Sequence, residues 1–266
     1  MKIAFIGGGN MGEAIIAAVL KEKLAVPADI SVSDISEPRR QYLKKQYGVA
    51  VTESNKEAVD GKDIVVLAVK PQNLNEVLAD LKDCLKSSQL VLSIVAGVKI
   101  DTVSRGLTHE RVVRTMPNTP AQAGIGFTGW TATPAVTREQ KVSSSNILRA
   151  MGKEIYFDNE ECLDMVTAVS GSGPAYVFLF AECLMDAAVN IGLSREQAQE
   201  MVLQTISGAA ELMQKSGRSP AELRRNVASK GGTTERALNV FEEAGLSRII
   251  SDAVKAAYER AKELGK

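Results

Sequence analysis

The sequence predicts an α/β protein in which a doubly wound, parallel-sheet domain is followed by an all-α domain. In the first half, short apolar runs rich in β-branched residues alternate with helix-length segments, a pattern typical of βαβ units. A glycine-rich turn follows the first of these runs. After about residue 160 the strand-like runs end and helical periodicity takes over. We therefore expect two domains, residues 1–160 and residues 161–266.

Five segments of the first half have the composition of buried strands. Residues 64–69 are apolar without polar alternation, as expected of a central strand covered by helices on both faces. Helix-length segments lie between the strands, so the order of elements predicts a doubly wound sheet. The expected strands are 3–6, 30–33, 64–69, 90–95 and 111–116, and the expected helices lie near 11–21, 37–47, 72–85 and 100–107.

The segment 176–191 of the second half predicts a helix that needs a partner. Its strongly polar residues are Glu182, Asp186 and Asn190, spaced by four, which leaves one thin polar stripe on an otherwise apolar helix. A central helix in a compact monomer is one interpretation. We expect instead that a second subunit covers it, in a homodimer or in a larger ring built from dimers.

Charge and cysteine usage narrow the class of partner. Thirty-two basic residues balance thirty-two acidic ones, so no positive field favours nucleic acid or an anionic membrane surface. The three cysteines lack metal-ligand spacing and fit reduced thiols, and we expect no metal site. The N-terminus lacks a signal-peptide pattern, and charges interrupt the apolar runs before the length of a membrane span. We expect a cytoplasmic protein that binds a small molecule.

The glycine-rich turn predicts a Rossmann-type dinucleotide site. Gly7, Gly9 and Gly12 form G-x-G-x-x-G between a strand and a helix, with Asn10 and Met11 inside the motif. In this context the first glycine allows a tight turn, the second allows a pyrophosphate to approach, and the third allows close packing of helix on strand. The free amides of the helix N-terminus would bind the anion. A glycine-rich turn without a ligand is the alternative.

Asp34 is the candidate for recognition of the adenosine ribose. It ends the second expected strand, about 20 residues after the glycine motif, where such an acidic residue belongs. A carboxylate there binds the ribose hydroxyls and repels a 2′-phosphate, which favours NADH. Asp34 as an ordinary turn residue before a helix is the alternative. The choice between NAD and NADP stays open because residues close in sequence could bind a 2′-phosphate, namely Ser33, Ser36, Arg39 and Arg40.

Elimination leaves hydride transfer as the chemistry. The single histidine, His109, lies in a charged connection and is expected to be a solvated surface residue. The chain has no nucleophile elbow, zinc-binding helix or P-loop. A nicotinamide cofactor brings its own reactive atom, so the protein need only orient it. Reduction of an imine fits this sequence because a hydroxyl or water can serve as the proton partner.

Residues 229–234 form the candidate substrate loop. Gly231 and Gly232 precede Thr233 and Thr234 at an expected helix start, so backbone amides and hydroxyls could hold a carboxylate. The alternative is a glycine loop in which threonine merely caps the helix.

Six motifs in order make the chain resemble the pyrroline-5-carboxylate reductase family over its whole length. The resemblance implies a Rossmann domain, a helical dimerisation domain, NADPH or NADH, and reduction of 1-pyrroline-5-carboxylate, a cyclic imino acid, to L-proline. It also implies an active site between one subunit's nucleotide domain and helices that include the partner's. The motifs are F-I-G-G-G-N-M-G (5–12), A-V-K-P (68–71), A-G-V (96–98), M-P-N-T-P (116–120), S-G-S-G-P-A-Y (170–176) and S-K-G-G-T-T (229–234).

The resemblance also implies roles for individual residues. Asn55 should lie near the adenosine, and Thr234 should face the imine nitrogen as the catalytic residue. Two departures matter: Asp34 stands where the family often has serine, and Lys230 stands where it often has proline. The nicotinamide side should be lined by Ala68, Val69, Lys70, Pro71, Asn118 and Thr119, and the substrate carboxylate should be held by Ser229 with the amides of Gly232 and Thr233.

Two other functions fit parts of the sequence. A β-hydroxyacid dehydrogenase would need a lysine four residues after the last glycine of 171–173, where this chain has Val177. A non-catalytic dinucleotide sensor would be expected to have lost the substrate loop, and this chain retains Ser229 and Thr234.

Overall fold

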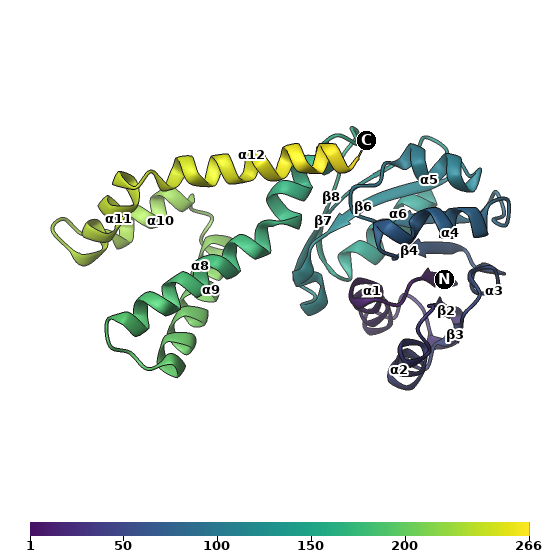
Figure 1. The fold of residues 1–266 in the computed structure, drawn as a ribbon, viewed down its shortest axis with the longest axis horizontal. Helices are drawn as coiled ribbons and strands as arrows, with labels where there is room; N and C mark the ends of the chain where they lie inside the picture. Colours follow the sequence, from purple (N-terminus) through teal and green to yellow (C-terminus); the bar gives the residue numbers. More distant parts are fainter. Residues whose placement is uncertain (266) are drawn as a thin grey trace. The chain divides into compact units, whose positions relative to one another are not determined.

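The computed structural model describes residues 1–265, and the described chain divides into two compact units (Figure 1). Unit 1 comprises Met1–Ser172 and the chain from Ala257 onward, and unit 2 comprises Gly173–Ala256. Unit 1 holds the sheet, and unit 2 is helical. The predicted fold class, a doubly wound sheet followed by helices, is confirmed.

The described part of unit 1 contains one eight-stranded sheet with the order β3-β2-β1-β4-β5-β6-β7-β8. All neighbouring strands are parallel except the antiparallel pair β6 and β7. The chain builds outward from β1 to β3 and then returns to place β4 on the other side of β1, which makes the gap between β1 and β4 the topological switch point. The strands are β1 Ile3–Ile6, β2 Ile30–Ser33, β3 Ala50–Thr52, β4 Ile64–Leu67, β5 Leu90–Ser93, β6 Val112–Pro117, β7 Gly126–Ala132 and β8 Gly152–Tyr156.

Helices cover both faces of the sheet. On one face Ile15, Leu43 and Ile147, from α1, α2 and α6, pack on alternate residues of the strands. On the other face α3, α4 and α5 bury residues such as Leu78 and Leu107. Because β1 and β4 are buried along their whole length, these strands carry no polar alternation. The helices are α1 Asn10–Lys21, α2 Glu37–Tyr47, α3 Asn55–Val59, α4 Leu74–Leu81, α5 Ile100–Leu107 and α6 Arg138–Arg149.

The second half is helical, and its helices begin at well-formed caps. Ser194 and Ser219 each accept a hydrogen bond from the third helical residue and complete a capping box. Helices α8 and α9 lie side by side (Figure 1). A π-helical turn, η4 (Thr167–Gly171), joins α7 to α8. The helices are α7 Cys162–Val166, α8 Gly173–Asn190, α9 Arg195–Ser216, α10 Pro220–Val227, α11 Thr233–Glu243 and α12 Leu246–Leu264.

Helix α8 leaves its apolar side chains uncovered within the described chain. Phe178 is 66% exposed and Leu179 is 61% exposed. The continuous helical run Cys162–Asn190 is long and apolar enough to cross a membrane by length and composition, and 11% of its most apolar window is buried. The expectation that charges interrupt the apolar runs before the length of a membrane span is therefore wrong for this segment, because its charged residues, Asp164, Glu182 and Asp186, are too few to offset its apolar side chains.

Two further expectations about unit 1 need correction. The described sheet has three strands beyond the five expected, β3, β7 and β8. His109 is buried, at 5% exposure, and its Nε2 lies 2.8 Å from the carbonyl oxygen of Gln89. The prediction of a solvated His109 was wrong. It relied on the charged residues beside His109 in the sequence, whereas the fold buries the ring and places a backbone carbonyl oxygen within hydrogen-bond distance of it. His109 precedes β6, at the opposite edge of the sheet from the glycine turn.

Candidate functional site

The glycine turn lies at the switch point of the sheet. Gly7 has φ of +95°, and a Cβ there would lie 2.8 Å from the carbonyl oxygen of Ala68, which follows β4. A Cβ on Gly12 would lie 2.7 Å from the carbonyl oxygen of Gly7, whereas one on Gly9 would find no other described atom within 4 Å. The turn is therefore tight at its first and last glycine and open at the middle one, which fits the approach of a pyrophosphate.

Helix α1 opens directly from this turn. Gly9 is its N-cap, and none of the described side chains caps it, so the first amides of the helix have no side-chain acceptor. Asn10 and Met11 form the first helical turn beside Gly9. The positive end of the helix dipole and these amides together favour an anion at this place.

Gly8 is a site residue that motif reasoning missed. A Cβ at this position would lie 2.5 Å from Cδ1 of Leu43 in α2. Its amide donates to Oδ2 of Asp34 at 2.8 Å. Packing against α2 therefore favours glycine at this middle position of the three consecutive glycines, and only the register between α2 and the turn could have revealed this.

Asp34 bonds both the glycine turn and the N-cap residue of α2, Ser36. Its Oδ1 accepts a hydrogen bond from the amide of Ser36 at 2.9 Å, while its Oδ2 accepts that of Gly8. One carboxylate oxygen, Oδ1, therefore has the role of an ordinary turn residue before a helix, which was the alternative to ribose binding. The other oxygen lies at the glycine turn, where a ribose contact was expected.

Ser33 and Asn55 form a polar chain beneath this edge. Ser33 is 1% exposed, and its hydroxyl donates to Oδ1 of Asn55 at 2.7 Å. The amide of Asn55 donates to Oδ2 of Asp80 at 3.0 Å. The hydroxyl of Ser33 thus orients Asn55. Because this hydroxyl is buried, it is not accessible to a 2′-phosphate.

A carboxylate on α1 gathers three donors from α2. Glu13 accepts hydrogen bonds from Arg39, from Tyr42 at 2.9 Å and from Tyr47 at 2.8 Å. Burial acts to raise the pKa of Glu13, but these three hydrogen bonds outweigh it and hold the pKa below its usual value. Burial and the bond to Glu13 raise the pKa of Tyr47 to about 12.

Both candidate phosphate-binding arginines already have partners. Nε of Arg39 donates to the carbonyl oxygen of Gly8, and its Nη2 pairs with Glu13. Nη1 of Arg40 donates to the carbonyl oxygen of Asp34 at 2.6 Å, and its Nη2 lies 3.6 Å from the exposed carboxylate of Glu53. Arg40 is thus the more weakly paired of the two.

The residues expected beside the nicotinamide come from the carboxyl ends of two strands. Ala68 and Val69 follow β4, and both contact the space above Gly7. Lys70 caps the short 3-10 turn that begins at Pro71. Thr119 begins a second 3-10 turn, η3 (Thr119–Ala123), which contacts α1. Unit 1 therefore brings these residues to the same edge as the glycine turn.

Asn118 connects this edge to the π-helical turn. Its Oδ1 accepts the amide of Phe127 at 2.8 Å, and its Nδ2 donates to Oγ of Ser170 at 3.1 Å. Two motifs, M-P-N-T-P and S-G-S-G-P-A-Y, thus meet through one hydrogen bond. π-helical turns are frequent at functional sites because they displace side chains from regular helical positions.

A buried ion pair holds the helix that precedes this turn. Arg114 of β6 is 3% exposed. Its Nη1 lies 2.8 Å from Oε1 of Glu160, and its Nη2 lies 3.4 Å from Oδ1 of Asp164 in α7. Glu160 also accepts the amide of Ile100 at 2.7 Å. The start of α7 is therefore fixed to the strand that Asn118 directly follows.

The candidate substrate loop lies in unit 2 and is internally bonded. Gly231 has φ of +75°, and its amide donates to Oε2 of Glu235 at 2.6 Å. The amide of Gly232 donates to the carbonyl oxygen of Ser229 at 3.0 Å, and a Cβ on Gly232 would lie 2.4 Å from Oγ of Ser229. Gly231 thus already bonds one carboxylate, that of Glu235, which sequence reasoning did not single out.

Thr233 and Thr234 are the first two residues of α11. Gly232 is the N-cap of this helix, and no described side chain caps it. The interpretation of these threonines as caps is therefore wrong in this structure. Their amides belong to the first helical turn, which has no intrahelical acceptor.

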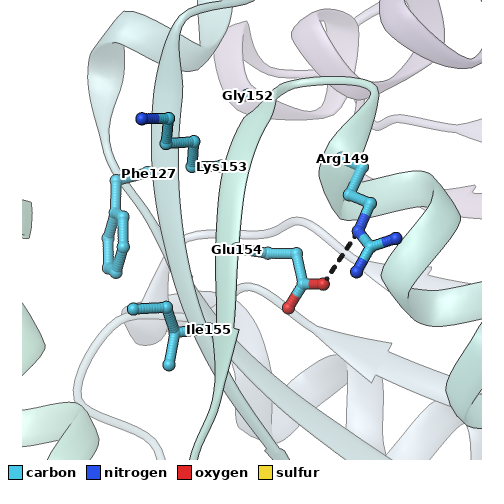
Figure 2. Close-up of a pocket in the computed structure, with 6 residues that line it drawn as sticks. All are labelled: Phe127, Arg149, Gly152, Lys153, Glu154 and Ile155. Carbon is cyan, nitrogen blue, oxygen red and sulfur yellow. Dashed lines mark hydrogen bonds and ion pairs between the residues drawn. The ribbon is translucent and has the colours of Figure 1, made fainter. Parts of the chain in front are cut away.

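A hollow at the sheet edge, shown in Figure 2, contains none of the predicted site residues. Phe127 and Ile155 point to one side of β8, and Glu154 points to the other, where it pairs with Arg149 at 3.0 Å. Burial acts to raise the pKa of Glu154, but bonds from Trp130, Ser145 and Arg149 lower it overall. Residues 1–265 contain no cluster of three metal-ligating side chains.

A doubly wound sheet whose switch point carries an open glycine turn defines a dinucleotide-binding protein of the Rossmann type. Residues 160–264 match the family model described as pyrroline-5-carboxylate reductase dimerisation, and residues 2–97 match one described as NADP oxidoreductase coenzyme F420-dependent. The chain belongs to the pyrroline-5-carboxylate reductase family, whose members are NAD(P)-dependent oxidoreductases of proline biosynthesis. The resemblance found in the sequence motifs is confirmed.

Relatives match this chain over nearly the full length of both proteins. The pyrroline-5-carboxylate reductase of Synechocystis sp. is 42% identical over 100% of this chain and 99% of its own length. A solved structure of the enzyme from Coxiella burnetii matches with a TM-score of 0.93 and 38% identity, covering 100% of this chain and 98% of that one. The Plasmodium falciparum enzyme, solved with NADP bound, matches with a TM-score of 0.90 and 34% identity over 100% and 98% of the two chains.

Proposed function

We propose that the protein reduces 1-pyrroline-5-carboxylate to L-proline with NADPH or NADH. The observation that carries this is the glycine turn, in which Gly7 packs against Ala68 and Val69 while Gly9 stays open, in a chain whose full-length relatives are pyrroline-5-carboxylate reductases. The nicotinamide cofactor supplies a hydride to the carbon of the C=N bond. The residues present fit this group, because an open glycine, uncapped helix amides and the carboxylate of Asp34 lie together at one edge.

The cofactor side of the proposed mechanism uses unit 1. Gly7, Gly9, Asn10, Met11 and Gly12 would bind the pyrophosphate, since their backbone forms the turn and the first helical turn. Asp34 would bind the ribose, and Asn55, oriented by Ser33, would lie near the adenosine. The nicotinamide would be bordered by Ala68, Val69, Lys70, Pro71, Asn118 and Thr119.

The substrate side uses the loop of unit 2. The hydroxyl of Ser229 and the amides of Gly231, Gly232 and Thr233 would hold the carboxylate, with Glu235 releasing Gly231. The hydroxyl of Thr234 would donate to the ring nitrogen and orient it. The nitrogen of an imine is basic enough to accept a proton near neutral pH, so no strong side-chain acid is required.

The proposed roles belong to two consecutive domains: residues 1–160 bind the nucleotide, and residues 161–266 dimerise and hold the substrate. The family model over residues 160–264 is itself named for dimerisation. The balanced charge of the chain supports a small-molecule substrate in the cytoplasm, with neither nucleic acid nor membrane as partner.

We propose that helix α8 packs against a second copy of the chain in a homodimer, and that these dimers can assemble into rings. The exposed Phe178 and Leu179 and the dimerisation-model match support this over a membrane. Sedimentation at micromolar concentration should give at least twice the monomer mass of 28.5 kDa, without detergent. A monomer would refute the assembly, and a requirement for detergent would support a membrane instead.

The activity test is oxidation of NADPH or NADH by the purified protein with 1-pyrroline-5-carboxylate, measured by the loss of reduced-cofactor absorbance. Turnover with the imino acid but not with a β-hydroxyacid would support the proposal. Turnover with the hydroxyacid alone would favour the dehydrogenase, although Val177 stands where its lysine would be. Cofactor binding without turnover of either compound would identify a sensor.

A further inference from the structure

The side chain of Glu13 neutralises Arg39, one of the two arginines close to the expected ribose site. Nη2 of Arg39 pairs with the carboxylate of Glu13, and both side chains are mostly buried, at 24% and 19% exposure. The guanidinium also lies over the ring of Tyr42, 5.0 Å from its centroid. This ion pair is partly buried and has the ring of Tyr42 against its guanidinium, so it is more persistent than an exposed surface pair.

The position of Arg39 relative to Asp34 follows from Gly8, which both residues bond. The amide of Gly8 donates to Asp34, and its carbonyl oxygen accepts Nε of Arg39. The guanidinium of Arg39 is thus one peptide unit away from the carboxylate expected to bind the adenosine ribose. A 2′-phosphate on that ribose would arrive between the carboxylate of Asp34, whose hydrogen-bond donors are backbone amides, and an arginine whose charge is already paired.

Two tyrosines fix the carboxylate of Glu13 in place. Tyr42 and Tyr47 both donate to Oε1, which leaves Oε2 directed at Arg39. The three donors come from α2 and the acceptor from α1, so the cluster also joins the two helices that flank the glycine turn. Arg39 cannot turn toward a ligand without breaking this arrangement.

We propose that Glu13 determines coenzyme preference by withholding Arg39 from the 2′-phosphate of NADP(H). This rests on the proposed function for the identity of the ligand. Glu13, Asp34 and Arg39 together carry one net negative charge, which disfavours a dianionic phosphate. Without the charge of Glu13, Arg39 becomes a charge-assisted donor for the phosphate, because arginine matches phosphate geometry with paired N–H groups.

The test compares adenosine 2′,5′-bisphosphate with AMP, which differ only in the 2′-phosphate, by titration calorimetry on the full-length protein. Glu13→Gln should tighten the bisphosphate relative to AMP by about tenfold, the effect of one charge-assisted hydrogen bond. The kcat/KM ratio of NADPH to NADH should rise by a similar factor. Tyr42→Phe, which removes one bond to Glu13 but keeps the ion pair, should leave both ratios unchanged.

The double variant Glu13→Gln with Arg39→Gln should return both ratios to the parent values, because the gain requires the arginine. An unchanged ratio in Glu13→Gln, or a gain that survives the loss of Arg39, would overturn the proposal. A fall in the ratio would also overturn it, since Glu13 would then orient Arg39 toward the phosphate. Calorimetry needs no turnover, so absence of imine reduction would count against the proposed function and not against this inference. Thermal melting of each variant confirms folding.

Discussion

The carboxylate of Asp34 accepts a hydrogen bond from the amide of Gly8 at 2.8 Å, across 26 positions of sequence. The end of β2 and the glycine turn after β1 are therefore one structural unit. A substitution at Asp34 changes the charge at the ribose and also releases an amide of the turn, so the two effects must be separated by experiment.

Replacing Asp34 by Ser should raise the kcat/KM ratio of NADPH to NADH by roughly tenfold or more, because a carboxylate beside a 2′-phosphate costs roughly 1–3 kcal/mol. Asp34→Asn is the matched variant, since its oxygen can still accept the amide of Gly8 while the charge is gone. Equal gains in both variants identify charge as the cause. If neither ratio changes, Asp34 does not set the preference.

Thr234→Ala should lower kcat about three- to tenfold at saturating substrate, because one neutral hydrogen bond contributes about 0.5–1.5 kcal/mol. If the hydroxyl also organises proton delivery, the loss reaches about 100-fold. Gly232, not a threonine, is the N-cap of α11, so thermal stability should change little. A variant that melts earlier yet keeps full turnover would contradict a catalytic role, and steady-state kinetics with calorimetric cofactor binding separates the two.

Gly232→Ala should raise the KM for the imino acid at least about tenfold, since the added Cβ would lie 2.4 Å from Oγ of Ser229 and displace a predicted carboxylate ligand. Gly208→Ala in α9 is the control, because its Cβ meets no other described atom within 4 Å and alanine favours a helix. Cofactor affinity should be unchanged in both. A normal KM in Gly232→Ala would remove this loop from the substrate site.

Arg114→Gln should lower the free energy of unfolding by about 3–5 kcal/mol, because it leaves the buried carboxylate of Asp164 without its counter-charge. Arg105→Gln, which breaks an exposed pair with Asp101 one helical turn away, should cost under about 1 kcal/mol. Urea unfolding of the two variants measures the difference. Equal costs would show that the pair with Glu160 and Asp164 does not fix α7.

The free energy of unfolding should depend on pH at both ends of the scale, because Glu13 and Tyr47 are hydrogen-bonded to each other in the folded protein. The pKa of Tyr47 is raised to about 12, so its contribution to stability is complete below the unfolded value of 10.0 and is lost as pH rises through about 12. The pKa of Glu13 is lowered, so its contribution is present above the unfolded value of 4.5 and is lost as pH falls through the folded value. Urea unfolding across pH, with Glu13→Gln and Tyr47→Phe as comparisons, measures both limbs. In Glu13→Gln the ultraviolet titration of tyrosine should show Tyr47 ionising at lower pH, and an unchanged curve would contradict the assigned hydrogen bond.

Sequence reasoning recovered the parts of the fold that have strong periodicity. Strands β1 and β4 are continuous apolar runs, β2, β5 and β6 are short segments rich in β-branched or aliphatic residues, and the serine caps of α9 and α10 are local signals that need no tertiary contact. It missed β7 and β8 because Gly126, Gly129 and Gly152 lower strand propensity and the remaining residues are half-polar. Strand β7 forms by pairing with β6, and β8 forms by pairing with β7, which no local window can show.

The candidate site divides in the same way. Glycine spacing predicted the turn, because Gly7 has a positive φ, a Cβ on Gly12 would meet the carbonyl oxygen of Gly7, and Gly9 leaves space for a ligand. The pairing of Arg39 with Glu13 depends on how α1 and α2 pack, over 26 positions of sequence, and was not visible. The roles of the nicotinamide residues stay predictions, and the variants at Gly232 and Thr234 test the substrate loop.

The last turns of α12 belong to unit 1, where a Cβ on Gly97 would lie 3.0 Å from Cβ of Leu264. A ribosome therefore releases β1 to β8 long before the helix that covers the A-G-V turn has been made. Until then the turn around Gly97 lacks the helix that packs against it, and a nascent chain of residues 1–172 is an unfinished nucleotide-binding unit. Synthesis order thus delays completion of the first-made unit until α12 has been made, so chaperone capture of nascent chains should be concentrated in this interval.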